Sequence, residues 1–208
     1  MRLQRWLSFG GRNYGILERM NNFERRVLRL FEDIHPLDQV ARAGYVLRGV
    51  AGPESVAAHS HFVSLLTLLF AEEYPEQFDR GKAVTMALIH DLAEAQLMDV
   101  PMPAANRYIR DAKNRAEQAI TENLFAGFST KFAAYHQELL DAVTPEARLV
   151  RGLDKAQMML KIAMYEREGR GRLAEFWDNP RNFNDHGLEP VSALFDAICA
   201  AAGRTRPR

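Results

Sequence analysis

Four side chains of metal-ligating types stand out in this 208-residue sequence: His59, the adjacent pair His90 and Asp91, and Asp154. Two imidazoles and two carboxylates suit a borderline-hard divalent cation such as manganese, iron, cobalt or zinc. Four protein ligands on an ion that prefers five or six leave room for water and a substrate, which is typical of a catalytic site. The sequence therefore predicts one divalent metal ion with an open coordination position.

Each of these side chains falls in a stretch whose apolar pattern predicts a buried helix. The first half of Ala83–Gln96, before the His-Asp pair, is apolar on all sides, as in a central helix. Within Ser55–Glu73, His59 shares the apolar stripe, and Asp154 stands inside a third apolar run. Burying such polar groups is costly unless they have a partner, and a bound cation is the simplest partner for all of them.

Spacing adds Glu94 to this set, since it follows His90 by four residues and Asp91 by three, so that one helix surface can carry them. A His-Asp pair by itself is a weak signal. The ordered set of His, His-Asp and Asp on predicted buried helices is what carries weight. The reversed pair Asp185-His186 lies in a Gly- and Asn-rich turn, so we do not expect it to bind the metal.

Apolar residues at helical spacing predict an all-α fold, and no segment alternates as a strand does. Thr144 and Pro145 form a helix start, with an N-cap followed by proline in the first turn. The expected helices cover Phe23–Ile34, Leu37–Val50 (interrupted at Gly44), Ser55–Glu73, Gly81–Leu97, Arg107–Phe125, Lys131–Val143, Pro145–Glu168, Arg172–Trp177 and Leu188–Ala201.

Composition limits the classes of partner and compartment. Lys+Arg and Asp+Glu both number 27, so a net charge of zero predicts no general attraction to nucleic acid polymers or membrane surfaces. The longest run without Asp, Glu, Lys or Arg is Ser55–Ala71, which is too short to span a bilayer comfortably. Cys199 is the only cysteine, which excludes an intramolecular disulfide and favours a reducing, cytoplasmic location.

The chain is expected to form one domain, because its length suits a single core and no linker composition divides it. Residues 1–22 are predicted to be a flexible N-terminal extension, since 1–20 are rich in glycine and arginine and lack helical periodicity. Residues 23–202 would be the folded domain. The basic segment 203–208 is predicted to be a flexible tail.

The order H…HD…D resembles the HD-domain metal-dependent phosphohydrolases, and more closely the branch with bacterial 5′-deoxynucleotidases and their eukaryotic HD-domain relatives. The likeness extends from about Pro36 to near the C-terminus. The segments that carry it are Arg42-Ala43-Gly44-Tyr45, Pro53-Glu54-Ser55-Val56-Ala57-Ala58-His59-Ser60, Ala87-Leu88-Ile89-His90-Asp91-Leu92-Ala93-Glu94, Asp99-Val100-Pro101, Leu153-Asp154-Lys155 and Gly171-Arg172-Leu173-Ala174-Glu175-Phe176.

This resemblance implies an HD-type helical bundle with a buried metal site that hydrolyses nucleoside 5′-monophosphates. It implies His59, His90, Asp91 and Asp154 as the ligands of one divalent ion. It also implies four further roles: Glu94 as the acid–base or water-orienting carboxylate, Asp99 as a second acid, Arg42 as the ligand of the substrate phosphate, and Tyr45 as a contact of the sugar or base. A homodimer is expected from the same resemblance.

Three positions depart from the family pattern: Ala58 replaces the usual acid before the first His, Met98 the usual Gly before Asp99, and Tyr45 the usual Trp. None of them removes a proposed ligand. Met98 and Tyr45 could reshape the pocket, which leaves the preference for deoxyribose open.

Two alternative functions stay open at this point. The first is an HD phosphohydrolase of another phosphoester, such as a cyclic or pyrophosphorylated nucleotide, and the second is a metal- or nucleotide-binding regulatory module without turnover. Single residues also have simpler readings: His59 as a core histidine, Asp99 as a turn residue, and Arg42 as a surface arginine.

Overall fold

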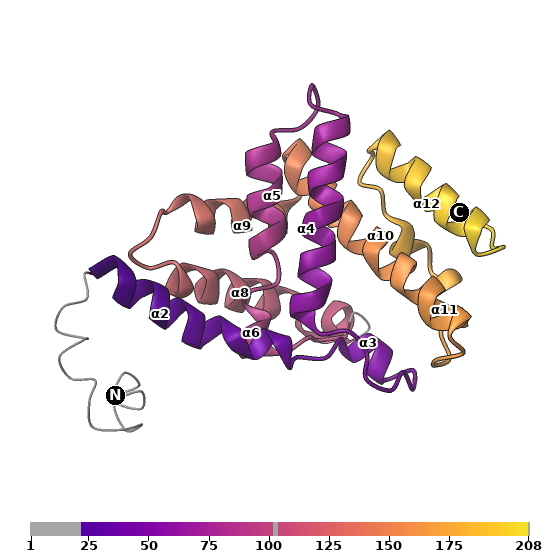
Figure 1. The fold of residues 1–208 in the computed structure, drawn as a ribbon, viewed down its shortest axis with the longest axis horizontal. Helices are drawn as coiled ribbons and strands as arrows, with labels where there is room; N and C mark the ends of the chain where they lie inside the picture. Colours follow the sequence, from indigo (N-terminus) through magenta and orange to yellow (C-terminus); the bar gives the residue numbers. More distant parts are fainter. Residues whose placement is uncertain (1–21, 102–103, 208) are drawn as a thin grey trace.

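The computed structural model describes residues 22–101 and 104–207, which form helices joined by short loops (Figure 1). The helical segments are α2 (Asn22–Ile34), the 3₁₀ helix η3 (His35–Asp38), α3 (Ala43–Val46), α4 (Val56–Glu73), α5 (Arg80–Ile89), α6 (Glu94–Leu97), the π-helical turn η4 (Ala105–Ile109), α8 (Arg110–Leu124), α9 (Lys131–Asp141), α10 (Pro145–Arg167), α11 (Ala174–Trp177), the 3₁₀ helix η5 (Pro180–Phe183) and α12 (Glu189–Ala201). Within the described residues, extended pairing is limited to an isolated bridge between Ala41 and Ser55. The all-α prediction is confirmed.

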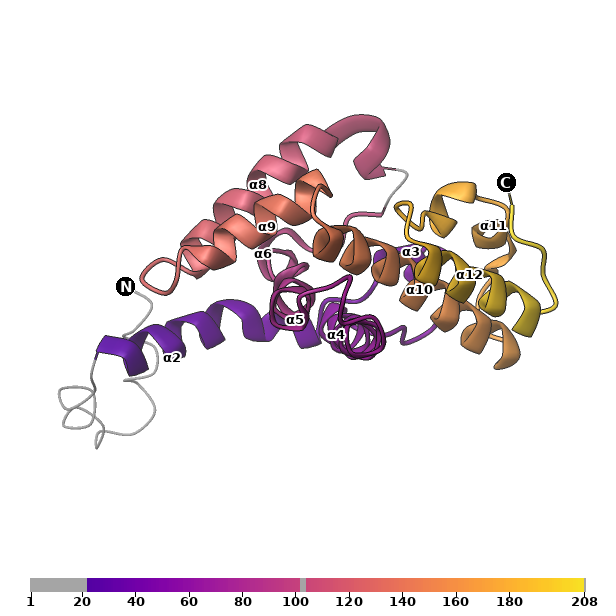
Figure 2. The ribbon, with the colours of Figure 1, turned by 90° about the horizontal axis from the view of Figure 1, so that it is seen from above.

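Helices α4, α5 and α10 form the centre of the molecule, where each packs against the other two. Helix α12 covers α10 on one side, and the α8–α9 pair lies on the other side, next to α5 (Figures 1 and 2). Apolar side chains of α10, among them Leu149, Leu153 and Ile162, are fully buried. The elements with the predicted ligands therefore make up the core of the fold.

Local capping explains where the central helices begin. Ser55 Oγ accepts a hydrogen bond from Ala58 N (3.2 Å) at the start of α4. Thr144 Oγ1 accepts one from Ala147 N (3.4 Å) at the start of α10, as the sequence predicts. Such a side-chain oxygen satisfies one of the amide groups that the first helical turn leaves without a partner.

The prediction of one continuous helix over Gly81–Leu97 is wrong, because α5 ends at Ile89 and α6 begins at Glu94. At the break, His90 Nδ1 lies 2.7 Å from the carbonyl oxygen of Ala87. In a continuous helix that oxygen would accept from the amide four residues later, so the His90 side chain takes the place of a backbone donor. His90 and Asp91 therefore lie in the turn between α5 and α6, outside the regular helices.

Three further segments depart from the predicted helices. Over Leu37–Val50, only η3 and the short α3 are helical, and the residues between them are extended enough to bridge to Ser55. The segment predicted as a helix from Arg107 begins with the π-helical turn η4 before α8 becomes regular. The predicted helix at Arg172 is reduced to α11.

Two arginines after α12 contact folded residues. Arg206 donates to Ser192 Oγ (2.7 Å), Phe183 O (2.8 Å) and Asp185 Oδ2 (2.9 Å), while the Arg204 guanidinium lies 5.7 Å from the Trp177 ring centroid. The predicted extension lies outside the described residues except for its last residue, and the flexibility of both ends stays a prediction. Among the described helices, none has the length and apolar character that crossing a membrane requires.

Candidate metal centre and active site

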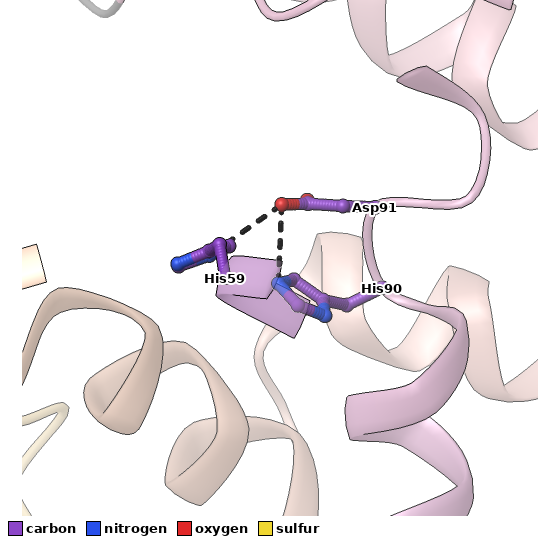
Figure 3. Close-up of side chains that lie close together, drawn as sticks. All are labelled: His59, His90 and Asp91. Carbon is purple, nitrogen blue, oxygen red and sulfur yellow. Dashed lines mark ion pairs between the residues drawn. The ribbon is translucent and has the colours of Figure 1, made fainter. Parts of the chain in front are cut away.

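The four predicted metal ligands come together from α4, the turn between α5 and α6, and α10. His59 Nε2 lies 3.1 Å from Asp154 Oδ1 and 3.6 Å from Asp91 Oδ2. His90 Nε2 lies 3.2 Å from the same Asp91 oxygen, so that Asp91 faces both imidazoles (Figure 3). Ligand atoms of His59, His90 and Asp91 all lie within 4.8 Å of one another, which is close enough to share an ion.

The hydrogen bonds of the two imidazoles fit a metal site. His90 Nδ1 faces the Ala87 carbonyl, which can only accept, so Nδ1 carries a proton and Nε2 is the nitrogen left to bind a metal ion. His59 Nδ1 faces Gln157 Oε1 at 2.6 Å in the same manner. Both Nε2 atoms are buried and have no hydrogen-bond partner among the described residues. A buried Nε2 that faces a carboxylate suits a cation between the two, and a divalent metal ion would satisfy both.

The charges of the cluster favour a bound cation as well. Burial acts to raise the pKa of Asp91, but the neighbouring imidazoles of His90 and His59 lower it overall. Burial likewise opposes ionisation of Asp154, yet Lys155 and His59 hold its pKa well below the ordinary value. For His90, burial acts to lower the pKa and the Asp91 carboxylate raises it above the usual range. Both carboxylates are thus charged at neutral pH and attract positive charge to the site.

Arg42 joins this cluster from the residue directly before α3. Its Nη1 lies 3.7 Å from Asp91 Oδ2, and its Nη2 lies 3.9 Å from Asp154 Oδ1. Burial acts to lower the pKa of Arg42, but the carboxylates of Asp99, Asp154 and Asp91 raise it. A guanidinium has five donors, so Arg42 could bind phosphate oxygens beside these carboxylates.

Asp99 contacts the Arg42 segment through the backbone, because its Oδ2 accepts a hydrogen bond from Ala43 N at 2.7 Å. This bond satisfies a free amide at the start of α3 and ties α3 to the loop after α6. The contact gives Asp99 a role in holding Arg42 in place. Met98, just before it, has a positive φ of 65°, a conformation that glycine adopts easily. The Gly that the family usually has at this position is thereby explained.

Glu94 is buried at the cavity wall, with 3% of its surface exposed. Its Oε1 lies 3.6 Å from Lys113 Nζ, and its Oε2 has no hydrogen-bond partner among the described residues. Burial, reinforced by the charges of Asp91 and Asp99, raises the pKa of Glu94 to about 9. A carboxyl group with a raised pKa can carry a proton at neutral pH and give it to a leaving oxygen.

Tyr45 is almost completely buried beside the cavity. Its ring packs edge-on against Tyr165, with centroids 5.3 Å apart, and near Phe176 at 6.2 Å. The hydroxyl donates to Met158 O (3.3 Å), and only 2% of the residue is exposed. Tyr45 does border the cavity, so its ring shapes the wall.

A cavity of about 870 Å³ opens beside the ligand cluster, within the size range of small-molecule sites. Arg42, His90, Asp91, Glu94, Asp99 and Asp154 all line it, together with the cationic residues Arg48, Arg110, Lys113, Arg151, Lys155 and Arg181. His59 has no exposed surface and supports the cluster from within the core. All of the predicted site residues except His59 therefore line one cavity.

His136 belongs to the cavity wall, although the sequence motifs described above do not include it. His136 lines the cavity and is buried, with 2% of its surface exposed. Its Nδ1 lies 2.9 Å from Gln118 Oε1. The signal was present, since His136 precedes Leu139 and Leu140 by three and four residues and so shares their apolar face.

Solved structures resemble this fold over most of the chain. A conserved hypothetical protein from Pyrococcus furiosus matches with a TM-score of 0.71 and 31% identity, covering 86% of this chain and 99% of that one. A protein from Pyrococcus horikoshii matches with a TM-score of 0.70 and 32% identity over 85% and 98%. A Magnetospirillum magnetotacticum structure titled "predicted metal-dependent phosphohydrolase" shares the fold, with a TM-score of 0.62 at 22% identity over 86% and 95%.

Curated relatives named 5′-deoxynucleotidase HDDC2 are similar in sequence. The Xenopus laevis protein is 28% identical over 83% of this chain and 87% of its own length. The Danio rerio protein is 31% identical over 73% and 76%, respectively. A family model described as "HD domain" matches residues 34–184, which include every predicted site residue. The chain therefore belongs to the HD-domain family.

Proposed function

We propose that the protein is a metal-dependent phosphomonoesterase that hydrolyses (deoxy)nucleoside 5′-monophosphates to nucleoside and phosphate. The observation that carries this proposal is the clustering of His59, His90, Asp91 and Asp154 beside a cavity that Arg42 and Glu94 also line. The relatives named 5′-deoxynucleotidase support the substrate class. Manganese, cobalt, iron or zinc would suit the two-imidazole, two-carboxylate donor set.

When bound, the metal ion would polarise the phosphoryl group and lower the pKa of a water molecule. Arg42 would bind two phosphate oxygens with its planar guanidinium, which Asp91 and Asp154 already hold beside the ligand set. Asp99 would keep the Arg42 segment in place through Ala43 N.

Glu94 would supply the proton that the leaving group of the reaction needs. Hydrolysis forms a bond between water oxygen and phosphorus and breaks the bond between phosphorus and the 5′ oxygen. The leaving oxygen then needs a proton, which a carboxyl group with a pKa of about 9 can supply, and the carboxylate that results can take up the proton that the attacking water loses. Lys113, 3.6 Å from Glu94, would stabilise the carboxylate that results.

The test is phosphate release from a panel of ribo- and deoxyribonucleoside 5′-monophosphates, with manganese or cobalt added. We expect hydrolysis of the monophosphates and none after chelation. The control is Asp154→Ala, which should lose both bound metal and activity. Cleavage confined to cyclic or pyrophosphorylated nucleotides would refute the proposed substrate, and metal binding without turnover of any nucleotide would refute the enzyme.

We also propose that the protein forms a homodimer through the outer face of α4. Phe62, Leu65 and Leu69 recur on that face and are 43%, 44% and 55% exposed, and Leu88 of the adjoining α5 is 56% exposed. Grouped apolar surface of this kind is typical of protein interfaces. Sedimentation velocity should give a dimer that Leu65→Glu together with Leu69→Glu converts to a monomer; a monomeric wild-type protein would contradict the proposal.

A further inference from the structure

The two ring nitrogens of His59 have different tasks in the proposed metal site, on which this inference rests. Nε2 faces Asp91 and Asp154 and must be free of a proton to bind a metal ion. Nδ1 must then carry the proton, and it lies 2.6 Å from Gln157 Oε1. Whether His59 Nε2 is free to bind a metal ion therefore depends on which end of the Gln157 amide faces Nδ1.

The Gln157 amide could face His59 with either end, since its oxygen accepts hydrogen bonds and its nitrogen donates them. With the nitrogen turned toward Nδ1, the proton of His59 would move to Nε2 and block the metal. Glu54 decides between these states. Its two carboxylate oxygens lie 3.1 Å and 3.3 Å from Gln157 Nε2, and a carboxylate accepts only. The amide nitrogen must face Glu54, so the amide oxygen must face His59.

Glu54 is held firmly enough to exert this control. Its side chain is 2% exposed, and Lys161 Nζ lies 3.6 Å from Oε2, which balances the buried charge. The backbone amide of Glu54 donates to Tyr165 Oη at 2.8 Å. Gln157 and Lys161 are one turn apart on α10, and Gln157 follows Asp154 by three residues. One helix thus supplies both a ligand and the residue that orients another ligand.

We propose that Glu54 and Gln157 are positioning residues of the metal centre. Glu54 fixes the orientation of the Gln157 amide, and that amide fixes the proton of His59 on Nδ1, so that Nε2 points its lone pair at the metal. Neither residue touches the ion or the substrate. Neither residue would be counted among the metal ligands. Supporting contacts of this kind nevertheless commonly change metal affinity by about 10–100-fold.

Exchanging the two side chains tests the proposal. In Glu54→Gln, residue 54 can offer either amide end and the orientation of Gln157 is no longer fixed. In Gln157→Glu, two carboxylates face each other, and their repulsion moves the side chain of residue 157 away from His59 Nδ1. Each single variant should weaken cobalt binding to the metal-free protein about 10–100-fold in isothermal titration calorimetry.

In the double variant, the carboxylate at position 157 can accept from both His59 and the amide at position 54. Lys161 can donate to the oxygen of that amide, so affinity should recover.

A second readout follows the proton itself. Nitrogen-15 NMR of the metal-free wild-type protein should show His59 protonated on Nδ1, and Glu54→Gln should give a mixture of the two tautomers. Gln118→Leu is the matched control, because it removes a glutamine–histidine hydrogen bond at His136 and should leave cobalt affinity unchanged.

Three results would overturn the proposal: a wild-type His59 protonated on Nε2, single variants that fold and bind cobalt as tightly as wild type, or a folded double variant that fails to recover. If the variants bind cobalt as expected but the wild-type protein hydrolyses no nucleotide, the proposed function is refuted and the positioning role of Glu54 and Gln157 stands. If the single variants do not fold, the double variant and the wild-type tautomer still decide.

Discussion

At the scale of single residues, the site concentrates negative charge around Arg42. Asp91 and Asp154 lie within 4 Å of its guanidinium, and Asp99 is the strongest of the charges that raise its pKa. A metal ion bound to Asp91 and Asp154 would share their oxygens with Arg42. The guanidinium would then keep donors available for a phosphate beside the proposed metal ligands.

Replacing Glu94 by glutamine should separate metal binding from turnover. Glu94→Gln keeps the size of the side chain and removes the proton that the leaving oxygen needs, so phosphate release should fall about 10²–10⁴-fold. Metal content measured by elemental analysis should stay at the wild-type level. Glu117 also contacts Lys113 and lines the cavity, so Glu117→Gln is the control and should retain most activity. An unchanged rate in Glu94→Gln would remove this residue from the mechanism.

Met98 stores backbone strain that glycine would relieve. Its φ of 65° with ψ of 164° lies in a region that residues with a Cβ avoid, at a cost of about 1–3 kcal/mol. The side chain is 56% exposed, so little packing is lost on its removal. Met98→Gly should raise the unfolding free energy by about 1 kcal/mol after the added entropy of the unfolded chain is subtracted. The measurement is thermal unfolding beside Met98→Ala, which keeps the Cβ and should gain nothing; equal melting temperatures would contradict the strain.

At the scale of elements, α10 connects the site to the C-terminal part of the fold. One of its faces presents Asp154 and Gln157, and Gly152 lies against α12. A Cβ added at Gly152 would lie 2.9 Å from Val191 Cγ1, closer than real Cβ atoms approach. The absence of a side chain at this position therefore sets how closely α12 packs on α10.

Gly152→Ala should destabilise the protein even though alanine favours helices. Overpacking costs about 1–3 kcal/mol, while the gain in helix propensity is about 1 kcal/mol. The β-branched Val191 is fully buried and has few other rotamers, so the clash cannot be relieved cheaply. Urea unfolding should show a net loss of up to about 2 kcal/mol, which is the overpacking cost less the gain in helix propensity. Adding Val191→Ala should cost less in the Gly152→Ala background than in wild type; simple additivity would refute the contact.

At the scale of the whole molecule, the cavity gathers side chains from distant parts of the chain, from Arg42 before α3 to His186 before α12. Some of the polar groups that line it are buried, and burial changes their protonation. Burial lowers the pKa of His136 to about 4. His136 thus stays neutral in the folded protein at a pH where an unfolded chain would protonate it.

This difference makes stability fall in mild acid. Between pH 6.5 and about 4 the unfolded state binds a proton at His136 and the folded state does not, so unfolding becomes easier as the pH falls through this window. The contribution approaches about 1.4 kcal/mol per pH unit. In His136→Gln the amide can still donate to Gln118, and urea unfolding should show a shallower loss between about pH 6.5 and 5. The exposed His61, replaced by Gln, controls for the loss of any histidine; parallel curves for wild type and His136→Gln would contradict the prediction.

The sequence alone predicted the all-α fold and most helix positions. Periodicity is local, and the caps at Ser55 and Thr144 act within three residues of the chain. Residue type and order also selected His59, His90, Asp91 and Asp154, which the fold brings together, while their role as metal ligands stays a prediction. The break at His90 was missed, since it depends on a side chain that competes with a backbone amide for the Ala87 carbonyl.

Only the tertiary structure decided how those residues are held. The contact of His59 with Gln157 joins residues 98 positions apart, that of Gln157 with Glu54 joins residues 103 apart, and that of Asp99 with Ala43 joins residues 56 apart. Such contacts follow from helix packing and leave no periodic trace in the sequence. The sequence by itself determined which side chains could bind a cation, and the packing of α10 against α4 decided which nitrogen of His59 faces it.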